Sequence, residues 1–278
     1  DVPLGRLRAD VILACLDSKY ARQQVNQIAW RLGIPWVDAG VAADGLLARV
    51  NVYLPGDDQP CLECAWDERD YQTLEVKRPC QAGGGEAPTR APAFLGSLAG
   101  ALQAVECNKI LTGDWKSVAV GKQITFVAPS HQVHTMTFRR NPKCKFDHRS
   151  FQIQPFRCEP HKLSLRRFMN ALGKELGGND DIRLHMDGKA FERQWRCACG
   201  SGKAVLSLAG RTTAPERACP RCGGTMEPVG FAMLPSLCEG TLTPQERVKP
   251  LTSLGLATGD VVLVRTQNGQ HAFELVMP

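Results

Sequence analysis

The chain has 278 residues, 43% of them hydrophobic, and a formal net charge of +6. This length suits one large domain or two ordinary ones with a real core, and no dense basic stripe indicates a nucleic-acid partner. No apolar run approaches the ~20 residues of a membrane span, and no signal peptide opens the chain, so we expect no membrane partner either. Eight of the twelve cysteines lie in or near close Cys/His pairings, which is typical of intracellular metal sites and favours the cytoplasm.

Residues 11–54 are predicted to form a strand, a helix and two further strands. After the apolar run 11–16, five apolar residues recur on one helical face and end at a glycine: Ala21, Val25, Ile28, Ala29, Leu32 and then Gly33. Strand–helix–strand order predicts a parallel α/β sheet. The turn Asp44-Gly45, followed by alternating apolar residues up to Leu54, predicts a half-buried strand.

The remaining elements predict a change of character near residue 150. Residues 55–92 form a long loop, which in a compact domain is usually functional or mobile. A helix up to Gly113 and strands over 117–128 and 132–139 follow, and after them a short helix over 163–176 and a final strand from Val261. A boundary near 149–160 divides the chain into domains 1–150 and 151–278.

The first candidate metal site combines Cys61-x2-Cys64 with Cys144-x3-His148. Zinc takes four N or S ligands at tetrahedral corners, and four protein ligands leave no place for a catalytic water, so the site is expected to be structural. Two other readings stay open. Cys158-x2-His161 is a rival donor pair, and the residues are alternatively unrelated surface cysteines with a solvated histidine.

The second candidate site is more compact. Cys197-x-Cys199-Gly200 and Cys219-x2-Cys222-Gly223 form two cysteine knuckles separated by a short segment. This arrangement predicts a zinc ribbon, a small fold held together largely by its metal. The alternative is a redox pair, although no thioredoxin-like strand and helix surround these cysteines.

Several segments resemble the ThiF/MoeB family of ubiquitin-activating-type enzymes. The resemblance covers about residues 9–148 and rests on the order and spacing of its pieces, which are these: residues 9–18 with Ala21, Arg22 and Asn26; 33–45; Cys61 and Cys64; 95–98, 103–106 and 109–113; and 140–144. It implies a Rossmann-like ThiF/MoeB-type α/β fold. The C-terminal part is expected to be an α+β module that carries the zinc ribbon and has an ending that resembles a β-grasp fold. Because no G-x-G-x-x-G is present and the chain begins almost inside a strand, we expect the N-terminal nucleotide-binding half to be missing or provided by another chain. We therefore expect this chain alone to be inactive.

The resemblance also implies an activity. Family members use Mg-ATP to adenylate the C-terminal glycine of a ubiquitin-like or sulfur-carrier protein, and many then form a thioester or persulfide on a cysteine. Asp17 matches the aspartate that contacts Mg-ATP, its alternative being a helix N-cap. Arg22 and Asn26 follow it on the next helix and are candidates for binding the same cofactor, their alternative being a structural role. Cys80, in the long loop beside Lys77 and Arg78, is the candidate nucleophile because neighbouring cations favour a thiolate; its alternative is an ordinary loop cysteine or spare zinc ligand.

These expectations define the competing hypotheses. The first is an activating enzyme for a ubiquitin-like or sulfur-carrier protein, with ATP, Mg²⁺ and Zn²⁺. It would work as a homodimer or heterodimer, with a conjugating enzyme as a further candidate partner. The second is a non-catalytic zinc scaffold that pairs with an active partner and recruits ubiquitin-like proteins. A nucleic-acid-binding zinc-ribbon protein is the weakest reading, because the net charge is modest and such binding requires a steep salt dependence.

Overall fold

The computed structural model describes residues 2–74, 91–178 and 182–278. They fall into two compact units. The N-terminal unit is Arg8–Phe151, and the C-terminal unit combines Asp1–Leu7 with Gln152–Pro278. The first residues therefore pack with the end of the chain, and Gly5 N–H donates to the Gly259 carbonyl at 2.8 Å.

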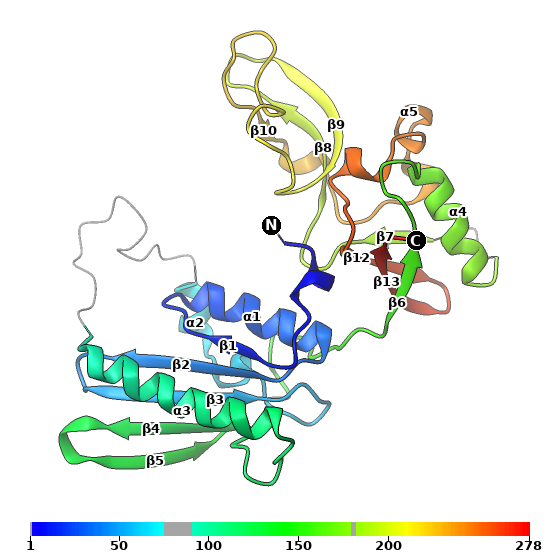
Figure 1. Cartoon of the computed structure of the whole chain (residues 1–278). Coiled ribbons are helices and arrows are strands. Elements are labelled where there is room, and N and C mark those ends of the chain that lie inside the picture. The colour runs from blue at the N-terminus through cyan, green and yellow to red at the C-terminus, as the bar shows by residue number, and fades with distance from the viewer. Residues whose placement is uncertain (1, 75–90, 179–181) are drawn as a thin grey trace. The chain divides into compact units, whose positions relative to one another are not determined.

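The N-terminal unit contains a five-stranded sheet in the order β1-β2-β3-β4-β5 (Figure 1). Its elements, with two short 3₁₀ turns omitted, are β1 (Ile12–Ala14), α1 (Lys19–Leu32), β2 (Trp36–Ala42), β3 (Leu47–Tyr53), α2 (Glu68–Gln72), α3 (Ala93–Leu111), β4 (Lys122–Val127) and β5 (Gln132–Thr137). β1 and β2 are parallel, as strand–helix–strand order predicts, whereas the later neighbours are antiparallel. The sheet is therefore mixed. The helix α1 joins the parallel strands β1 and β2, whereas short connections join β2 to β3 and β4 to β5, and short connections give antiparallel pairs.

The sequence explains the two ends of α1. Ser18 is its N-cap, with Oγ accepting from Ala21 N–H at 3.3 Å. Gly33 ends it in the left-handed conformation at φ +69°, which glycine adopts without steric cost. α1 packs on the side of the sheet that carries Trp36 and Tyr53, whose rings stack 4.7 Å apart.

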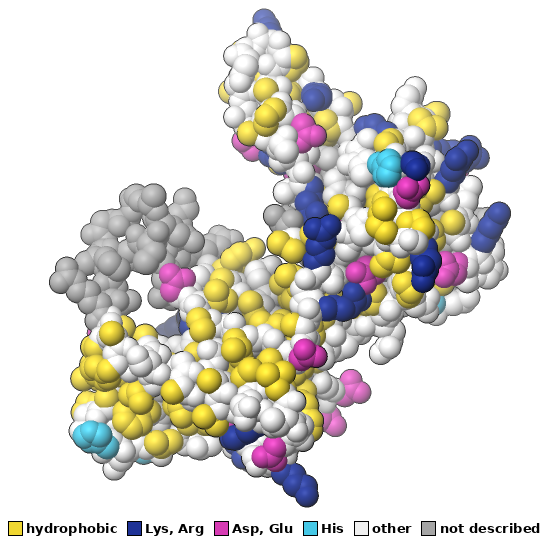
Figure 2. Space-filling model, in the orientation of Figure 1, with side chains coloured by type: hydrophobic (Ala, Val, Ile, Leu, Met, Phe, Trp, Pro, Cys, Tyr) yellow, Lys and Arg dark blue, Asp and Glu magenta, His cyan; other side chains and the backbone are white. Residues whose placement is uncertain are grey.

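α3 covers the opposite side of β2 and β3 (Figure 1). Gln103, buried on its inner face, donates to the carbonyls of Ala14 and Val37 at 3.1 and 2.9 Å. The outer face of this helix is also apolar, and Figure 2 shows hydrophobic side chains gathered over it. Phe94, Val105 and Leu111 are exposed there, so α3 leaves an apolar surface on this unit.

The C-terminal unit is built on a four-stranded sheet in the order β6-β13-β12-β7. Its principal elements are β6 (Ile153–Arg157), α4 (Leu165–Glu175), β7 (Arg183–His185), α5 (Pro244–Arg247), β12 (Val261–Thr266) and β13 (Gly269–Val276). β6 and β13 are parallel and the other pairs antiparallel. A core that includes Phe168, Leu184 and Phe273 joins α4 to the sheet.

A second small sheet is inserted between β7 and β12. It consists of β8 (Phe191–Arg196), β9 (Gly202–Leu208), β10 (Glu227–Pro228) and β11 (Met233–Leu234). The last three strands each pair antiparallel with β8. We call residues 191–234 the ribbon. No helix among the described residues is long and apolar enough to cross a membrane.

Candidate functional site

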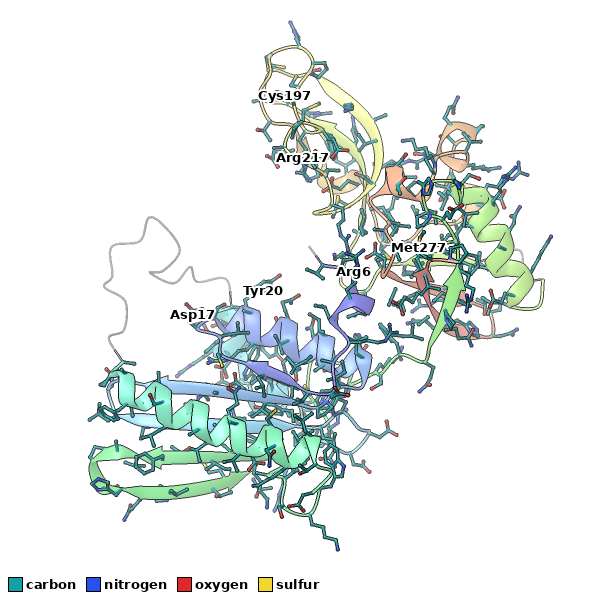
Figure 3. All side chains as sticks on the ribbon, viewed as in Figure 1. Arg6, Asp17, Tyr20, Cys197, Arg217 and Met277 are labelled. Carbon is teal, nitrogen blue, oxygen red and sulfur yellow. The ribbon has the colours of Figure 1, made fainter. Side chains whose placement is uncertain are left out.

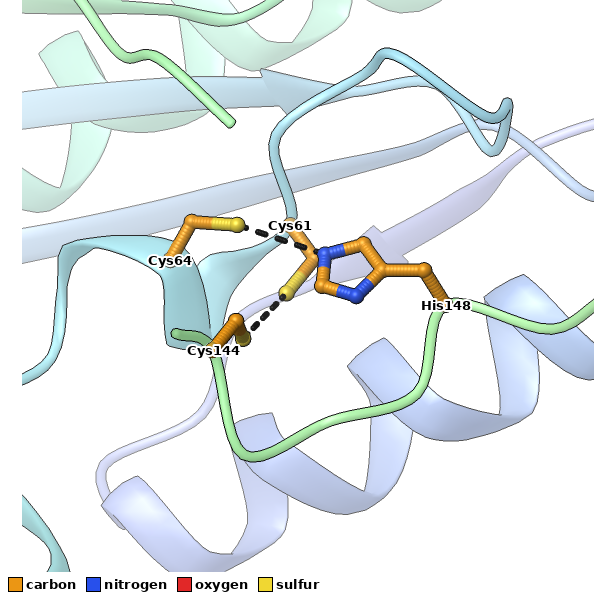
Figure 4. A group of neighbouring side chains, drawn as sticks. All are labelled: Cys61, Cys64, Cys144 and His148. Atoms are coloured by element: carbon orange, nitrogen blue, oxygen red, sulfur yellow. Dashed lines mark hydrogen bonds between the residues drawn. The ribbon is translucent and has the colours of Figure 1, made fainter. Parts of the chain in front are cut away.

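The first cysteine cluster comes together in the N-terminal unit. The ligand atoms of Cys61, Cys64, Cys144 and His148 all lie within 4.8 Å of one another. The Sγ atoms of Cys61 and Cys144 are 3.8 Å apart, and Cys64 Sγ is 3.2 Å from His148 Nε2 (Figure 4). Zn–S bonds of about 2.3 Å and Zn–N bonds of about 2.0 Å place tetrahedral ligands about 3.6–3.8 Å apart. The Cys61–Cys144 distance matches this spacing and the Cys64–His148 distance is about 0.4 Å shorter, so the cluster has the donor set of a closed metal site and nearly its dimensions.

The histidine is oriented for binding through Nε2. Its Nδ1 lies 2.8 Å from the Phe146 carbonyl oxygen, an acceptor, so the proton sits on Nδ1 and the Nε2 lone pair faces Cys64. The ring also meets Trp30 edge-on at 5.3 Å and Phe146 at 5.2 Å. Backbone and aromatic packing thus fix both the tautomer and the ring direction.

The sulfur of Cys64 carries the strongest preference for the thiolate. A hydrogen bond from the Cys61 thiol, and another from Asn141 N–H at 3.4 Å, lower the pKa of Cys64 to about 4. Burial raises the pKa of Cys61. A metal ion requires deprotonated thiols, so binding at this cluster must displace a proton from the buried Cys61.

Arg31 holds the segment that carries His148. Its guanidinium contacts both carboxylate oxygens of Asp147, at 2.6 and 3.2 Å, and donates to the Arg149 carbonyl at 2.9 Å. It also lies over the rings of Phe146 and Phe151, 5.0 and 4.8 Å from their centres. α1 therefore anchors both sides of the histidine through one side chain.

Glu63, between the two cysteines of the first knuckle, is a buried hydrogen-bond centre that the sequence patterns do not reveal. It is 2% exposed. Its Oε2 accepts from Gln23 at 2.9 Å and from the Tyr71 hydroxyl at 3.1 Å, and its Oε1 from Gln27 at 3.4 Å and Asn26 at 3.5 Å. One carboxylate thus ties the knuckle to α1 and α2. Its only sequence signal is an acid inside Cys61-x2-Cys64.

Two predicted nucleotide-contacting residues have internal partners. Asn26 is fully buried, and its Oδ1 accepts from Leu62 N–H at 3.1 Å. Arg22 pairs with the buried Asp38 at 2.8 Å and donates to the Ala39 carbonyl at 3.3 Å. Asn26 thus holds the first cysteine knuckle and Arg22 holds β2, and their contact with ATP stays a prediction.

Asp17 lies at the end of β1, just before α1 (Figure 3). Ser18, not Asp17, caps the helix, so the capping role considered for Asp17 is filled by its neighbour. The Asp17 side chain is exposed, and within the described parts of the chain it has no hydrogen bond or ion pair. A free carboxylate at the carboxyl end of a parallel strand is well placed to hold a cation beside phosphates.

Asp38, Arg22 and Arg49 form a buried charge network beside the carboxyl end of β1. Asp38 is fully buried on β2, and one of its oxygens, Oδ2, has no hydrogen-bond partner among the described residues. Burial raises its pKa, while Arg22 and Arg49 oppose the shift. A Cβ on Gly40 would lie 3.1 Å from a nitrogen of each arginine, so the glycine leaves room for both guanidinium groups. An acid in the middle of an apolar strand was the available sequence signal.

The other predicted residues are placed as follows. The second cluster, Cys197, Cys199, Cys219 and Cys222, comes together within 4.8 Å in the ribbon. The rival ligands Cys158 and His161 belong to the C-terminal unit, where Cys158 is buried in the core and His161 is exposed. Cys80, the candidate nucleophile, lies outside the described residues.

Comparison with known proteins gives a consistent picture for the first half of the chain. Residues 6–146 match the model of the ThiF family. The sulfur carrier protein ThiS adenylyltransferase of Escherichia coli K12 is 30% identical over 137 residues, 49% of each chain. Ubiquitin-like modifier-activating enzyme 5 of Oryza sativa subsp. japonica is 27% identical over 140 residues, 49% of this chain and 30% of the relative.

Among solved structures, E. coli MccB with ATP matches with a TM-score of 0.40 and 22% identity, covering 51% of this chain and 40% of MccB. The chain thus spans about half the length, or less, of the relatives it matches.

Proposed function

Since this chain belongs to the ThiF family, we propose that it acts in the ATP-dependent activation of the C-terminus of a ubiquitin-like or sulfur-carrier protein. The family relationship, at low identity, supports the general class of adenylyltransferase-type activating enzymes. The observation in the structure that carries the proposal is the free, exposed carboxylate of Asp17 at the carboxyl end of β1.

The proposed reaction has two steps. The carrier's terminal carboxylate attacks the α-phosphate of ATP, pyrophosphate leaves, and an acyl-adenylate forms. The thiolate of Cys80 then attacks the acyl carbon and AMP leaves, which gives a thioester. Asp17 would hold the Mg²⁺ that neutralises phosphate charge. The first cluster would hold a structural Zn²⁺, since its four protein ligands leave no position open.

The first step is tested by carrier-dependent exchange of labelled pyrophosphate into ATP, using the gene product that includes any sequence upstream of Asp1 and a ThiS-like protein as carrier. We expect Asp17→Asn to abolish the exchange, because the amide lacks the charge that binds Mg²⁺. Asp10→Asn is the matched control, since Asp10 is an exposed acid just before the same strand. Equal exchange in the two variants would remove Asp17 from the mechanism.

The second step is tested by trapping. Wild-type protein with Mg-ATP and the carrier should give an adduct that thiol reductants release, and Cys80→Ser should lose it. Cys107→Ser, which changes a cysteine outside both clusters, should keep it. An adduct that survives in Cys80→Ser would assign the nucleophile elsewhere.

A zinc scaffold that recruits ubiquitin-like proteins for an active partner is the second candidate. Two thiol-rich clusters, each with four ligands from the chain itself, favour it. It is supported if the protein binds the carrier while exchange and adduct are both absent.

The proposal extends to assembly and location. We expect a homodimer or heterodimer, which light scattering after size-exclusion chromatography measures, and a C-terminal unit that docks the carrier or a conjugating enzyme. Thiol clusters persist as metal ligands in a reducing compartment, which favours the cytoplasm.

A further inference from the structure

The ribbon carries a second metal site outside the family-matched residues. Cys197 and Cys199 lie at the turn from β8 to β9, and Cys219 and Cys222 in the loop that follows β9. We propose that these four thiolates bind one zinc ion, and that this ion is the folding core of the ribbon. This inference does not depend on the activity proposed above.

The sulfur positions fit a tetrahedral ion. Cys197 Sγ is 3.5 Å from Cys222 Sγ, and Cys199 Sγ is 3.7 Å from Cys219 Sγ. Four sulfurs at about 2.3 Å from a central zinc lie about 3.8 Å apart. A disulfide would require about 2.05 Å, so neither pair is bonded. Four protein ligands close the coordination shell, which is the arrangement of a structural zinc rather than a catalytic one.

The backbone of both turns is shaped around the sulfurs. Gly200 and Gly223, each directly after a knuckle, have φ of +85° and +74°, a region that other residues adopt only with strain. A Cβ on Gly224 would lie 3.4 Å from Cys222 Sγ and 3.7 Å from Cys197 Sγ. The chain therefore wraps closely around the sulfur cluster.

The ribbon has almost no apolar core of its own. Its buried cluster consists of Trp195, Met226, Cys197 and Cys219, with Val205 partly buried against them. Half of the fully buried members are thus proposed ligands. Segments this small rarely bury enough apolar surface to offset the entropy of ordering the chain, and a metal commonly supplies the difference.

Polar contacts organise the side of this cluster around Trp195. The Trp195 indole donates to Glu192 at 2.7 Å, and Arg217 donates to both oxygens of Glu192 at 2.9 and 3.1 Å while lying over the indole at 5.3 Å. Arg217 lies close before Cys219 in the chain (Figure 3 labels it near Cys197). Trp195 therefore reports on the order of the cysteine turns.

The base of the ribbon is held differently. Phe191, Leu206 and Leu208 are buried in the main core of the C-terminal unit. Removal of the ion should consequently release the turns around the cysteines, while the base of β8 and β9 stays paired.

Metal analysis tests the site. We expect about two zinc ions per wild-type chain if the first cluster is also filled, and about one fewer in Cys199→Ser or Cys222→Ser. These two positions are exposed, so the substitution itself disturbs little packing. Cys238→Ser, outside both clusters, should keep the wild-type content. Unchanged zinc in both ribbon variants, or iron as the ribbon's ion, would overturn the proposal.

Hydrogen exchange of the wild-type protein tests the folding role without any mutation. On chelation, amides around the two cysteine turns should lose protection at least about tenfold more than those of residues 206–208. Equal protection in the turns before and after metal removal, with metal loss verified by analysis, would show that the ion does not fold the ribbon.

Discussion

Glu63→Gln should destabilise the N-terminal unit even though the two side chains have nearly the same shape. The carboxylate accepts four hydrogen bonds, all from neutral donors, in a buried position. A glutamine can keep its oxygen at the Oε2 position, opposite Gln23 and Tyr71, but its amide nitrogen then faces Asn26 and Gln27. One buried donor without an acceptor costs about 1–3 kcal/mol, and the loss of a charged acceptor adds about 1 kcal/mol. We therefore expect a loss of about 2–4 kcal/mol.

Urea unfolding followed by tryptophan fluorescence measures this change. Four of the five tryptophans lie in the N-terminal unit, so a Trp195→Phe background confines the signal to it. Glu68→Gln is the control, because Glu68 is 67% exposed and makes one ion pair with Lys145; we expect less than about 0.5 kcal/mol there. If the two variants unfold within about 0.5 kcal/mol of each other, the hydrogen-bond centre at Glu63 does not hold the knuckle.

Three further substitutions probe the metal clusters and the C-terminal unit. Arg31→Lys should weaken zinc binding at the first cluster by about tenfold in chelator competition, because lysine cannot make the bidentate contact to Asp147 or stack; unchanged affinity would contradict this. Gly200→Ala should cost the ribbon about 1–2 kcal/mol at its positive φ and speed zinc release, whereas Gly240→Ala, in open space, should not. Burial and two neighbouring arginines lower the pKa of His185 in the folded protein. The unfolded chain therefore binds more protons below about pH 6.5, and the free energy of unfolding decreases as the pH is lowered. His185→Gln should flatten that fall in thermal unfolding of the C-terminal unit, and an equally steep fall would refute the assignment.

The sequence predicted elements well where local chemistry decides them. The apolar spacing up to Leu32, with Ser18 before it and Gly33 after it, corresponds to α1 as observed. The predicted strand over 117–128 is shorter in the structure, since β4 is Lys122–Val127. Val118 and Ala119 pack into the core instead, and Val120 bridges to Val52. Apolar runs alone do not distinguish a strand from a buried turn.

Tertiary contacts were less predictable. The spacing of cysteines and histidine in the sequence predicted which residues meet in both clusters, because such spacing is typical of metal ligands. Glu63 and Asp38 were missed, since each is defined by partners on other elements rather than by its neighbours in sequence. The last strand, β13, was missed, because its residues GQHAFELV do not alternate between apolar and polar.

The two clusters differ in what an ion would add to the fold. An ion in the first cluster links residues 83 apart in sequence, and one in the second links residues 20 apart. Chain-entropy arguments give about 4.5 and about 3.3 kcal/mol for crosslinks of these lengths, a difference of only about 1 kcal/mol. The packing around each cluster therefore determines how much the local fold depends on the ion. Two cysteines of the first cluster are among the nine buried members of a core that includes Trp30, Trp36 and Tyr53, whereas two cysteines of the second are half of the ribbon's own buried cluster. The ribbon is therefore the part of this chain whose fold depends most on its ion.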